Sequence, residues 1–246
     1  MLDDAQLQKI MPALPAAKRQ LYLPHLNAAM RANGIGTTVL RTAAFVAQLA
    51  HESGEFRWME EIWGPTAAQL RYEPPNALAQ RLGNTEIGDG QRFKGRGPIQ
   101  ITGRFNYAKY GQLLGRDLVA EPLLAAAPEL AFATAGLFWR TNGLNELADA
   151  QDFVTITRRI NGGTNGLADR QMYYARANTA LANGFVADPI ARSAPGSRTR
   201  SAPASQASEA VEPLTRGYEA VSRSERALKA AAARVAKRAP ARRVKA

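Results

Sequence analysis

Apolar residues recur every three or four positions along most of the first 188 residues, which is the period of an amphipathic helix. The pattern is strongest over residues 39–50, where apolar side chains cover most of the helix surface. A helix that is apolar on most sides is buried on most sides, so we expect this one at the centre of a bundle. Thr37 or Thr38 can cap its start, and Gly54 is expected to end it.

Six further segments combine this period with residues that start or stop helices. A short helix should begin at Asp3 or Asp4 and stop before Pro12, and the others are predicted over residues 16–32 (with Pro24 as a kink), 105–114, 128–140, 149–160 and 169–182. The pattern therefore predicts an all-α domain with minor β structure.

Residues 63–103 interrupt this helical pattern. They are rich in Gly, Pro and polar residues without a sustained period, and only weak strand signals occur, near Phe93 and Ile99. Irregular stretches of this length inside a compact domain are usually functional or disordered. The Trp, Tyr, Arg and carboxylate content of this one favours a functional role.

The last part of the chain has a different composition. Residues 1–188 are predicted to form the helical domain, residues 189–208 an Ala/Pro/Ser/Arg linker, and residues 209–246 a basic amphipathic tail that is helical or disordered. The net charge is +11, and residues 190–246 alone contain thirteen basic and four acidic residues. Arguments about acidic partners therefore apply to the tail, which could bind an anionic membrane or lipopolysaccharide.

Several classes of partner and site are disfavoured. There is no cysteine, so disulfides and thiolate chemistry are excluded. The two histidines, His25 and His51, have no metal-ligand spacing, and we expect neither metal nor cofactor. The tail has few aromatic residues for base stacking, so no nucleic acid is expected. We expect a monomer without a signal peptide, made in the cytoplasm and released by other means.

Glu52 is the first candidate for chemistry. It follows the most apolar helix, where partial desolvation would raise its pKa and keep a proton available for a glycosidic oxygen. The competing interpretation is a helix-terminal Glu paired with an Arg.

A glycosidase also needs a second carboxylate, and Glu60 and Glu61 follow Glu52 in the sequence. A continuous helix would place Glu61 about 13 Å away, whereas a turn at Gly54 could restore the roughly 6.5–9.5 Å of an inverting pair.

Two Gly-rich polar segments could complete a site. In residues 94–103, Gln100 and Thr102 alternate with two isoleucines, so the polar pair could face a cleft while the isoleucines face the core. Residues 161–166 form a second polar turn between helices. The aromatic residues Trp58, Trp63 and Tyr72 could stack on sugar rings, although lone aromatics are more often part of a core.

Four of these segments, in this order and spacing, resemble glycoside hydrolase family 19, the family of chitinases and phage endolysins. They are Ala47-Gln48-Leu49-Ala50-His51-Glu52-Ser53-Gly54, then Glu60-Glu61, then residues 95–107, then Arg159-Ile160-Asn161-Gly162-Gly163. The resemblance covers about residues 20–185. It implies a lysozyme-like helical fold and inverting hydrolysis of β-1,4 bonds in aminosugar chains.

The resemblance also implies roles for individual residues. Glu52 matches the general acid, Glu61 the general base with Glu60 as the fallback, and Thr102 the residue that holds the attacking water. The expected substrate-binding set is Glu60, Trp63, Gln100, Asn106, Asn161 and Arg170. Asn165 stands where the chitinases usually carry a Glu, and the stretch 62–95 is short. Both departures argue against chitin as the main substrate. We expect a peptidoglycan-degrading endolysin; the alternatives are a chitinase and a catalytically weak wall- or membrane-binding protein.

Overall fold

The computed structural model describes residues 1–189, which form eleven α-helices and one short 3₁₀ helix. Regular β structure in this part of the chain is limited to two isolated antiparallel bridges, Glu60–Arg96 and Arg96–Ile101. The predicted all-α fold with minor β structure is confirmed. Apart from Pro189, the predicted linker 189–208 and tail 209–246 lie outside the described residues.

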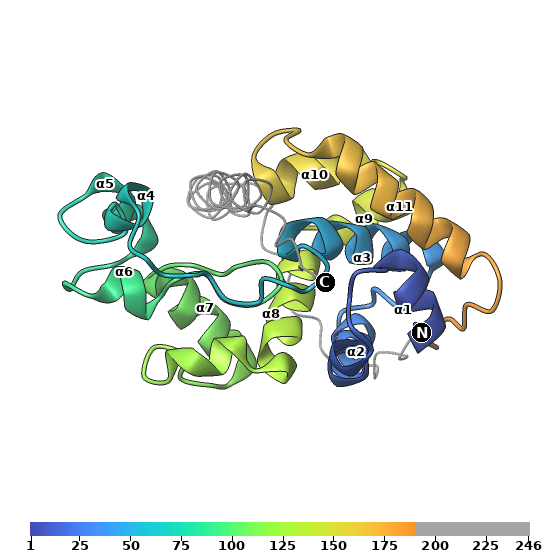
Figure 1. Ribbon diagram of the computed structural model, residues 1–246, viewed down its shortest axis with the longest axis horizontal. Coiled ribbons are helices and arrows are strands. Elements are labelled where there is room, and N and C mark those ends of the chain that lie inside the picture. The colour runs from blue at the N-terminus through green and yellow to red at the C-terminus, as the bar shows by residue number, and fades with distance from the viewer. Residues whose placement is uncertain (190–246) are drawn as a thin grey trace, which may run out of the picture.

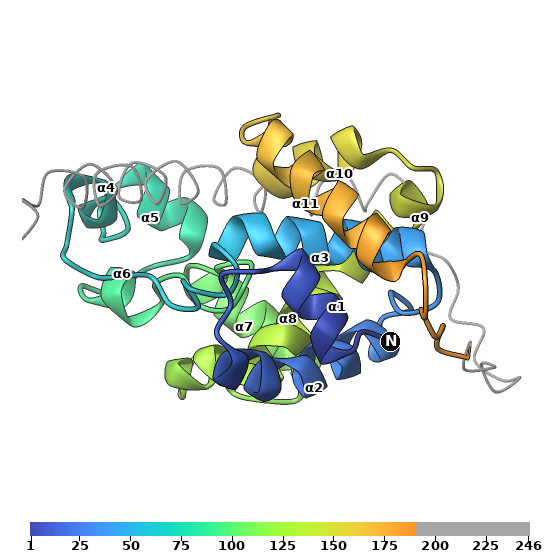
Figure 2. The same cartoon turned by 45° about the vertical axis from the view of Figure 1, so that its right-hand side comes forward.

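Helix α3 (Val39–Ser53) runs through the middle of the bundle, as Figures 1 and 2 show. Most of its residues are buried, as its apolar pattern predicts, and Thr38 caps its first turn by accepting the Arg41 N–H at 3.1 Å. Gly54 ends it in a left-handed conformation. These local signals were sufficient to predict both ends of the helix.

The other long helices pack around α3. Helix α11 (Leu167–Leu181) makes its most extensive contact, and α2 (Ala16–Ala32, with Pro24 inside) packs on α8 (Pro128–Thr141). Aromatic rings fill the space between helices, including Phe45 against Trp139 with ring centroids 5.2 Å apart. The short α1 (Asp4–Ile10), capped by Asp3, and the 3₁₀ helix η1 (Pro122–Ala126) complete the periphery.

One predicted helix has the wrong start. Residues 149–160 contain parts of two helices, α9 (Leu144–Asp149) and α10 (Phe153–Asn161). Between them Gln151 has φ +56°, a left-handed conformation that no helix continues through. The Asp152 carboxylate then caps α10 by accepting the Thr155 N–H at 2.9 Å. Hydrophobic period does not detect this break because it lies within polar residues.

The stretch 63–103 is also more ordered than predicted. It contains α4 (Ala67–Leu70), α5 (Ala77–Leu82) and α6 (Asp89–Arg92), which lie together at one end of the molecule (Figure 1) and lead into α7 (Arg104–Leu114). We call residues 63–92 the small lobe. It has its own apolar cluster of Tyr72, Leu78 and Leu82, with Trp63 packed against it. Helices of four to six residues are too short to show a period.

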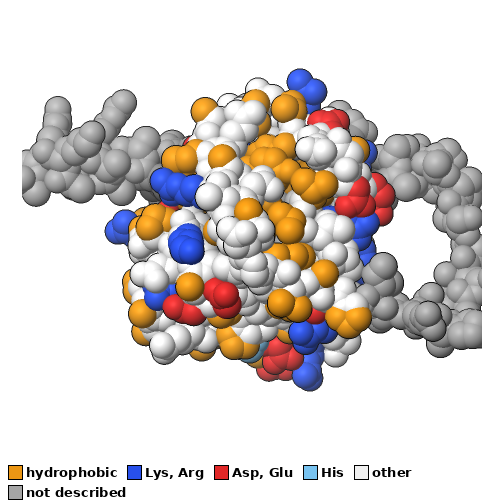
Figure 3. All heavy atoms as spheres, turned by 90° about the vertical axis from the view of Figure 1, so that its right-hand side faces the viewer, with side chains coloured by type: hydrophobic (Ala, Val, Ile, Leu, Met, Phe, Trp, Pro, Cys, Tyr) orange, Lys and Arg blue, Asp and Glu red, His pale blue; other side chains and the backbone are white. Residues whose placement is uncertain are grey.

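The surface fits a domain whose charges are nearly balanced. Residues 1–189 contain nineteen basic and seventeen acidic residues. The end of the molecule seen in Figure 3 accordingly shows basic and acidic groups interspersed among apolar ones. Within residues 1–189, no helix is long and apolar enough to cross a bilayer.

Candidate active site

Glu52 lies in the last turn of α3, where the chain reverses direction sharply. Gly54, Glu55 and Phe56 each have φ +58°, so three consecutive residues are left-handed. This conformation costs a non-glycine residue about 1–2 kcal/mol, and two hydrogen bonds hold it in place. The Ser53 hydroxyl accepts the Phe56 N–H at 2.8 Å, and the Glu55 carboxylate accepts the Ala13 N–H at 2.6 Å. The reversal therefore places Glu52 at a rigid helix end.

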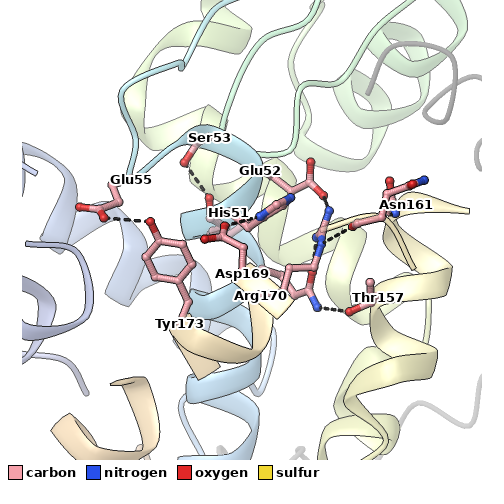
Figure 4. Close-up of polar contacts among 12 residues, drawn as sticks. His51, Glu52, Ser53, Glu55, Thr157, Asn161, Asp169, Arg170 and Tyr173 are labelled. Atoms are coloured by element: carbon pink, nitrogen blue, oxygen red, sulfur yellow. Dashed lines mark hydrogen bonds and ion pairs between the residues drawn. The ribbon is translucent and has the colours of Figure 1, made fainter. Parts of the chain in front are cut away.

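Arg170 of α11 is the charged partner of Glu52. The Arg170 side chain is fully buried, and its guanidinium donates to the Glu52 carboxylate (Figure 4). It also donates to the Gln48 side-chain oxygen. Its Nε donates to the Asn165 carbonyl at 3.3 Å, and the Gln48 amide donates to Thr157 Oγ1 at 2.9 Å. Two predicted site residues are thus brought together, and α3, α10 and α11 are joined by one polar network.

The surroundings of Glu52 have two opposite effects on its carboxyl group. Glu52 is only 6% exposed, and burial favours the protonated form, whereas the adjacent Arg170 guanidinium favours the ionised form. The structure therefore matches both interpretations of Glu52: a desolvated acid and a helix-terminal Glu paired with an Arg. A general acid needs both states in turn, since it gives up a proton and must then be stable as an anion.

His51 and Asp169 form a second pair beside the first. His51 Nδ1 lies 2.6 Å from Asp169 Oδ2, so residues 51 and 52 contact residues 169 and 170, respectively. Burial lowers the pKa of His51, the nearby Arg170 cation lowers it further, and the two carboxylates oppose this. Gly166, at the start of α11, has φ +69°, and a Cβ there would lie 2.4 Å from the imidazole. A glycine is required where the turn meets His51.

The turn between α10 and α11 closes this network. Asn161, the last residue of α10, is buried, and its amide donates to the carbonyls of Gly163 (3.4 Å) and Asn165 (3.3 Å). Asn165 takes part through its backbone carbonyl, which also accepts from Arg170. The turn predicted as a helix-to-helix connection therefore also positions the guanidinium next to Glu52.

Glu61 lies on the extended segment that follows the reversal, and its carboxylate is buried. It accepts hydrogen bonds from the Gly95 N–H (2.9 Å), the Gln69 amide (3.0 Å) and the Tyr72 hydroxyl (3.5 Å). Glu60 points to the other side, as alternation along an extended chain requires, and contacts Arg96 at 3.0 Å. The two adjacent carboxylates thus have different environments: Glu61 is enclosed, while the Glu60 side chain is 41% exposed.

The segment around Gln100 does not alternate as predicted. Residues 99–102 are all buried, and both isoleucines lie in the main apolar core as predicted, but Gln100 is not part of a regular extended strand. The reason is a tight turn, in which Gln100 has φ +53° and its amide donates to the carbonyls of Gly97 (2.7 Å) and Trp58 (3.1 Å). The Thr102 hydroxyl donates to the Gln100 carbonyl at 2.9 Å.

Two predicted substrate-binding amides retain an unused acceptor. Gln100 Oε1 and Asn106 Oδ1 are both buried and have no hydrogen-bond partner among the described residues. The Asn106 amide nitrogen donates to the Thr102 carbonyl at 2.8 Å, which fixes its orientation. Buried polar atoms are nearly always satisfied in folded proteins, so these two oxygens are among the few exceptions within residues 1–189.

The aromatic candidates differ in accessibility. Tyr72 is buried within the apolar cluster of the small lobe and has no ring face available for a sugar, so it belongs to a core and does not stack on sugar rings. Trp63 is half-buried, with its ring centroid 6.2 Å from that of Tyr72, and it stays a candidate. Trp58 is half-buried beneath the Arg57 guanidinium, 4.9 Å from its ring centroid.

Sequence patterns missed several residues of this network. They are Gln48, Glu55, Thr157, Asp169 and Tyr173, and their contacts link segments more than 100 residues apart. The one available signal was Gln48, a polar residue in an apolar helix, four positions before Glu52 and hence on the same face. Within residues 1–189, no cluster of three or more His, Asp or Glu side chains could hold a metal ion.

Comparison with known proteins identifies the family. The sequence profile described as chitinase class I, of glycoside hydrolase family 19, matches residues 15–188. The chain belongs to glycoside hydrolase family 19. It is therefore a glycosidase by family, and the lysozyme-like helical fold implied by the resemblance is confirmed.

The family 19 relatives include bacterial and plant proteins. A glycosyl hydrolase family 19 domain-containing protein of Haemophilus influenzae is 35% identical over 158 residues, which are 55% of this chain and 77% of that protein. An endochitinase of Arabidopsis thaliana is 41% identical over 130 residues, which are 52% of this chain but only 42% of that enzyme. The chain thus spans less than half of this plant enzyme's length.

Solved structures of this family have the same fold. A class IV chitinase from Zea mays superposes with a TM-score of 0.55 at 27% identity, covering 76% of this chain and 95% of that one. Chitinase C from Streptomyces griseus gives a TM-score of 0.56 at 23% identity, covering 76% and 78% respectively. The second similarity is one of fold alone.

Proposed function

We propose that this family 19 glycosidase hydrolyses β-1,4 bonds of the peptidoglycan glycan strand by single displacement, with Glu52 as the general acid. The buried Glu52–Arg170 pair at a rigid helix end is the observation that carries the proposal. A carboxyl that donates its proton becomes an anion in a poorly solvated place. Arg170 would stabilise that anion, and the fixed end of α3 would hold its orientation.

Glu61 is our candidate for the general base, with Glu60 as the fallback. Its two oxygens accept three hydrogen bonds, whereas a carboxylate offers about four acceptor positions, which leaves one for a water. The Thr102 hydroxyl uses its proton on the Gln100 carbonyl, so its oxygen can accept a hydrogen bond from that water. Deprotonated water would attack the sugar from the face opposite Glu52 and invert the anomeric centre. NMR detection of a retained anomer would refute this mechanism.

The proposed substrate-contacting residues are Trp63, Gln100, Asn106 and Asn161. Gln100 Oε1 and Asn106 Oδ1 would accept hydrogen bonds from sugar hydroxyl or acetamido groups, since both are buried without a partner among residues 1–189. Glu60, which contacts Arg96, would lie at the edge of the site. Arg170 would act through Glu52 and not on the sugar itself.

Peptidoglycan is preferred as substrate because of two features of the chain. The stretch 62–95 is short, and Asn165 stands where chitinases usually carry a Glu and contributes only its backbone carbonyl to Arg170. Chitin is the second candidate, because relatives 39–41% identical are endochitinases. A weakly active wall-binding protein is the third, and the presence of Glu52, Glu61 and Thr102 argues against it.

The cellular setting is part of the proposal. We infer an endolysin that is made in a bacterial cytoplasm, acts on the cell wall as a monomer, and reaches it after holin-mediated release. The predicted basic tail would add contact with an anionic membrane or lipopolysaccharide. Deleting residues 190–246 should weaken lysis of whole cells but spare cleavage of purified wall. An equal loss on both substrates would contradict the role of the tail.

A digest of purified Gram-negative peptidoglycan, analysed by mass spectrometry beside the Glu52→Gln variant, tests the function. Fragments with reducing N-acetylmuramic acid ends, absent with the variant, would support a muramidase. Reducing N-acetylglucosamine ends would move the cut to the other bond. Cleavage of chitin oligomers alone would favour the chitinase, and inactivity on both substrates would favour the wall-binding protein.

A further inference from the structure

A pocket of about 380 Å³ opens beside the end of α3 and is not used by the proposed mechanism. Its charged and polar lining comes from Lys18, Glu55, Arg57 and Tyr173, and Ala13 and Pro15 add apolar surface. In the view of Figure 4, the Glu55–Tyr173 contact lies on one side of His51 and the Glu52–Arg170 contact on the other. The pocket is therefore a neighbour of the candidate active site and separate from it.

Glu55 gives the pocket a buried acceptor. Its Oε1 accepts the Tyr173 hydroxyl at 2.9 Å, and its Oε2 accepts the Ala13 N–H at 2.6 Å. Each carboxylate oxygen has two acceptor positions, so one on each oxygen is still available. Burial and the hydrogen bond to Glu55 raise the pKa of Tyr173, which keeps its hydroxyl protonated and donating. The carboxylate thus has a fixed orientation and spare capacity for a donor in the pocket.

The two cations of the pocket have no acidic partner among residues 1–189. Lys18 is half-buried, and Arg57 is exposed with its guanidinium over the Trp58 ring. One anion and two unpaired cations around one cavity complement a ligand that carries both an ammonium and a carboxylate. A neutral sugar would use none of these three charges, so the pocket complements a charged ligand better than a bare glycan.

The geometry points to a site for the zwitterionic end of a diamino acid in the peptide stem of peptidoglycan. This inference rests on the proposed function. In meso-diaminopimelate stems, the side chain ends in an ammonium and a carboxylate on one carbon, whereas chitin has no charged group. Glu55 accepts the ammonium, and Lys18 and Arg57 contact the carboxylate. The site makes the enzyme specific for stem-bearing strands.

The distances along the chain suit this assignment. Glu55 lies three residues after Glu52, and Tyr173 lies three residues after Arg170, which is nearly one turn of α11. One helical turn advances about 5.4 Å, while a three-residue stem can extend roughly 10 Å. A stem attached to a sugar beside Glu52 can therefore reach the pocket without entering the candidate active site.

A titration of a soluble stem peptide into the full chain tests the inference without relying on catalysis. The probe is the tripeptide L-Ala-γ-D-Glu-meso-diaminopimelate, followed by calorimetry or NMR. The comparison peptide carries L-Lys, which keeps the ammonium and lacks the side-chain carboxylate. Each exposed ion contact is worth roughly two- to fivefold in affinity, so the double variant Lys18→Ala/Arg57→Ala should bind the first peptide about tenfold more weakly.

The matched control is Lys9→Ala/Arg140→Ala, which removes the same net charge from exposed helix positions outside the pocket. It should bind like the wild type, and the lysine peptide should bind weakly to every variant. Equal affinities for the two peptides, absence of binding, or an equal loss in the control variant would each overturn the inference. If the protein binds the first peptide selectively but cleaves no peptidoglycan, the proposed function fails while the stem site stands.

A kinetic comparison provides a second readout. On stem-bearing strands the Lys18→Ala/Arg57→Ala variant should show a KM raised several-fold with kcat unchanged, because the contacts are remote from the reacting bond. On strands stripped of stems by an amidase, the variant and the wild type should be equal. An equal rise of KM on both substrates would show that the cations act on the glycan or on the fold, and would overturn the stem site.

Discussion

Replacing Glu52 by Gln should destabilise the protein as well as inactivate it. The change leaves the fully buried Arg170 guanidinium with the neutral acceptors Gln48 Oε1 and the Asn165 carbonyl, and with no counter-charge from residues 1–189. Removing one member of a buried ion pair costs about 3–5 kcal/mol. The Gln amide keeps the volume and can still accept one hydrogen bond, so we expect the lower end, about 3 kcal/mol.

This loss is large compared with the free energy of unfolding of a typical domain, about 5–15 kcal/mol. For a domain of this size, each kcal/mol corresponds to roughly 2–4 °C, so the melting temperature should fall by about 6–12 °C. Urea and thermal unfolding at pH 7, followed by circular dichroism, measure both quantities. Peptidoglycan cleavage should fall by a factor of roughly 10²–10⁴, the usual contribution of a general acid.

Glu86→Gln is the matched control for this experiment. Glu86 is also paired with an arginine, Arg104, but its side chain is 68% exposed and Arg104 keeps its contact with Asp89, so its replacement should cost no more than about 1 kcal/mol. If Glu52→Gln were as stable as the wild type, the Arg170 contact would carry no net stabilisation. The argument that a charge-balanced pair holds the end of α3 would then be wrong.

Three further changes test the surroundings of Glu52. Gly166→Ala should cost about 2 kcal/mol or more in urea unfolding and reduce cleavage, because φ is +69° and the new Cβ would meet His51 at 2.4 Å; unchanged stability would disprove the close contact. The pKa of His51 is lowered by burial, so its contribution to stability is fully present above pH 6.5 and lost as the pH falls through the folded-state value. The stability difference between wild type and His51→Asn should therefore shrink on acidification from pH 8 to 5, and a constant or growing difference would contradict this. Tyr173→Phe removes one donor from the buried Glu55 carboxylate and should cost about 1.5–3 kcal/mol by urea unfolding, with a change under 0.5 kcal/mol arguing that water replaces the hydroxyl.

The sequence by itself determined the features that depend on neighbouring residues. Helix α3 begins after Thr38 and ends at Gly54, as its capping residues predict, because a cap needs only the backbone within one turn. The order of four motifs was also enough to predict the family, which the sequence profile over residues 15–188 confirms. The break at Gln151 and the short helices of the small lobe escaped prediction, since neither leaves a periodic signal.

Only the tertiary structure decided what surrounds each candidate residue. Glu52 meets Arg170 across 118 residues of chain, and Glu61 is enclosed by donors from Gln69, Tyr72 and Gly95. Hydrophobic period places a side chain on a face of its own helix, but it does not say which face of another helix will be opposite. Burial and charge pairing, which control the chemistry of a carboxylate, arise from that packing and so could not be predicted from the local sequence.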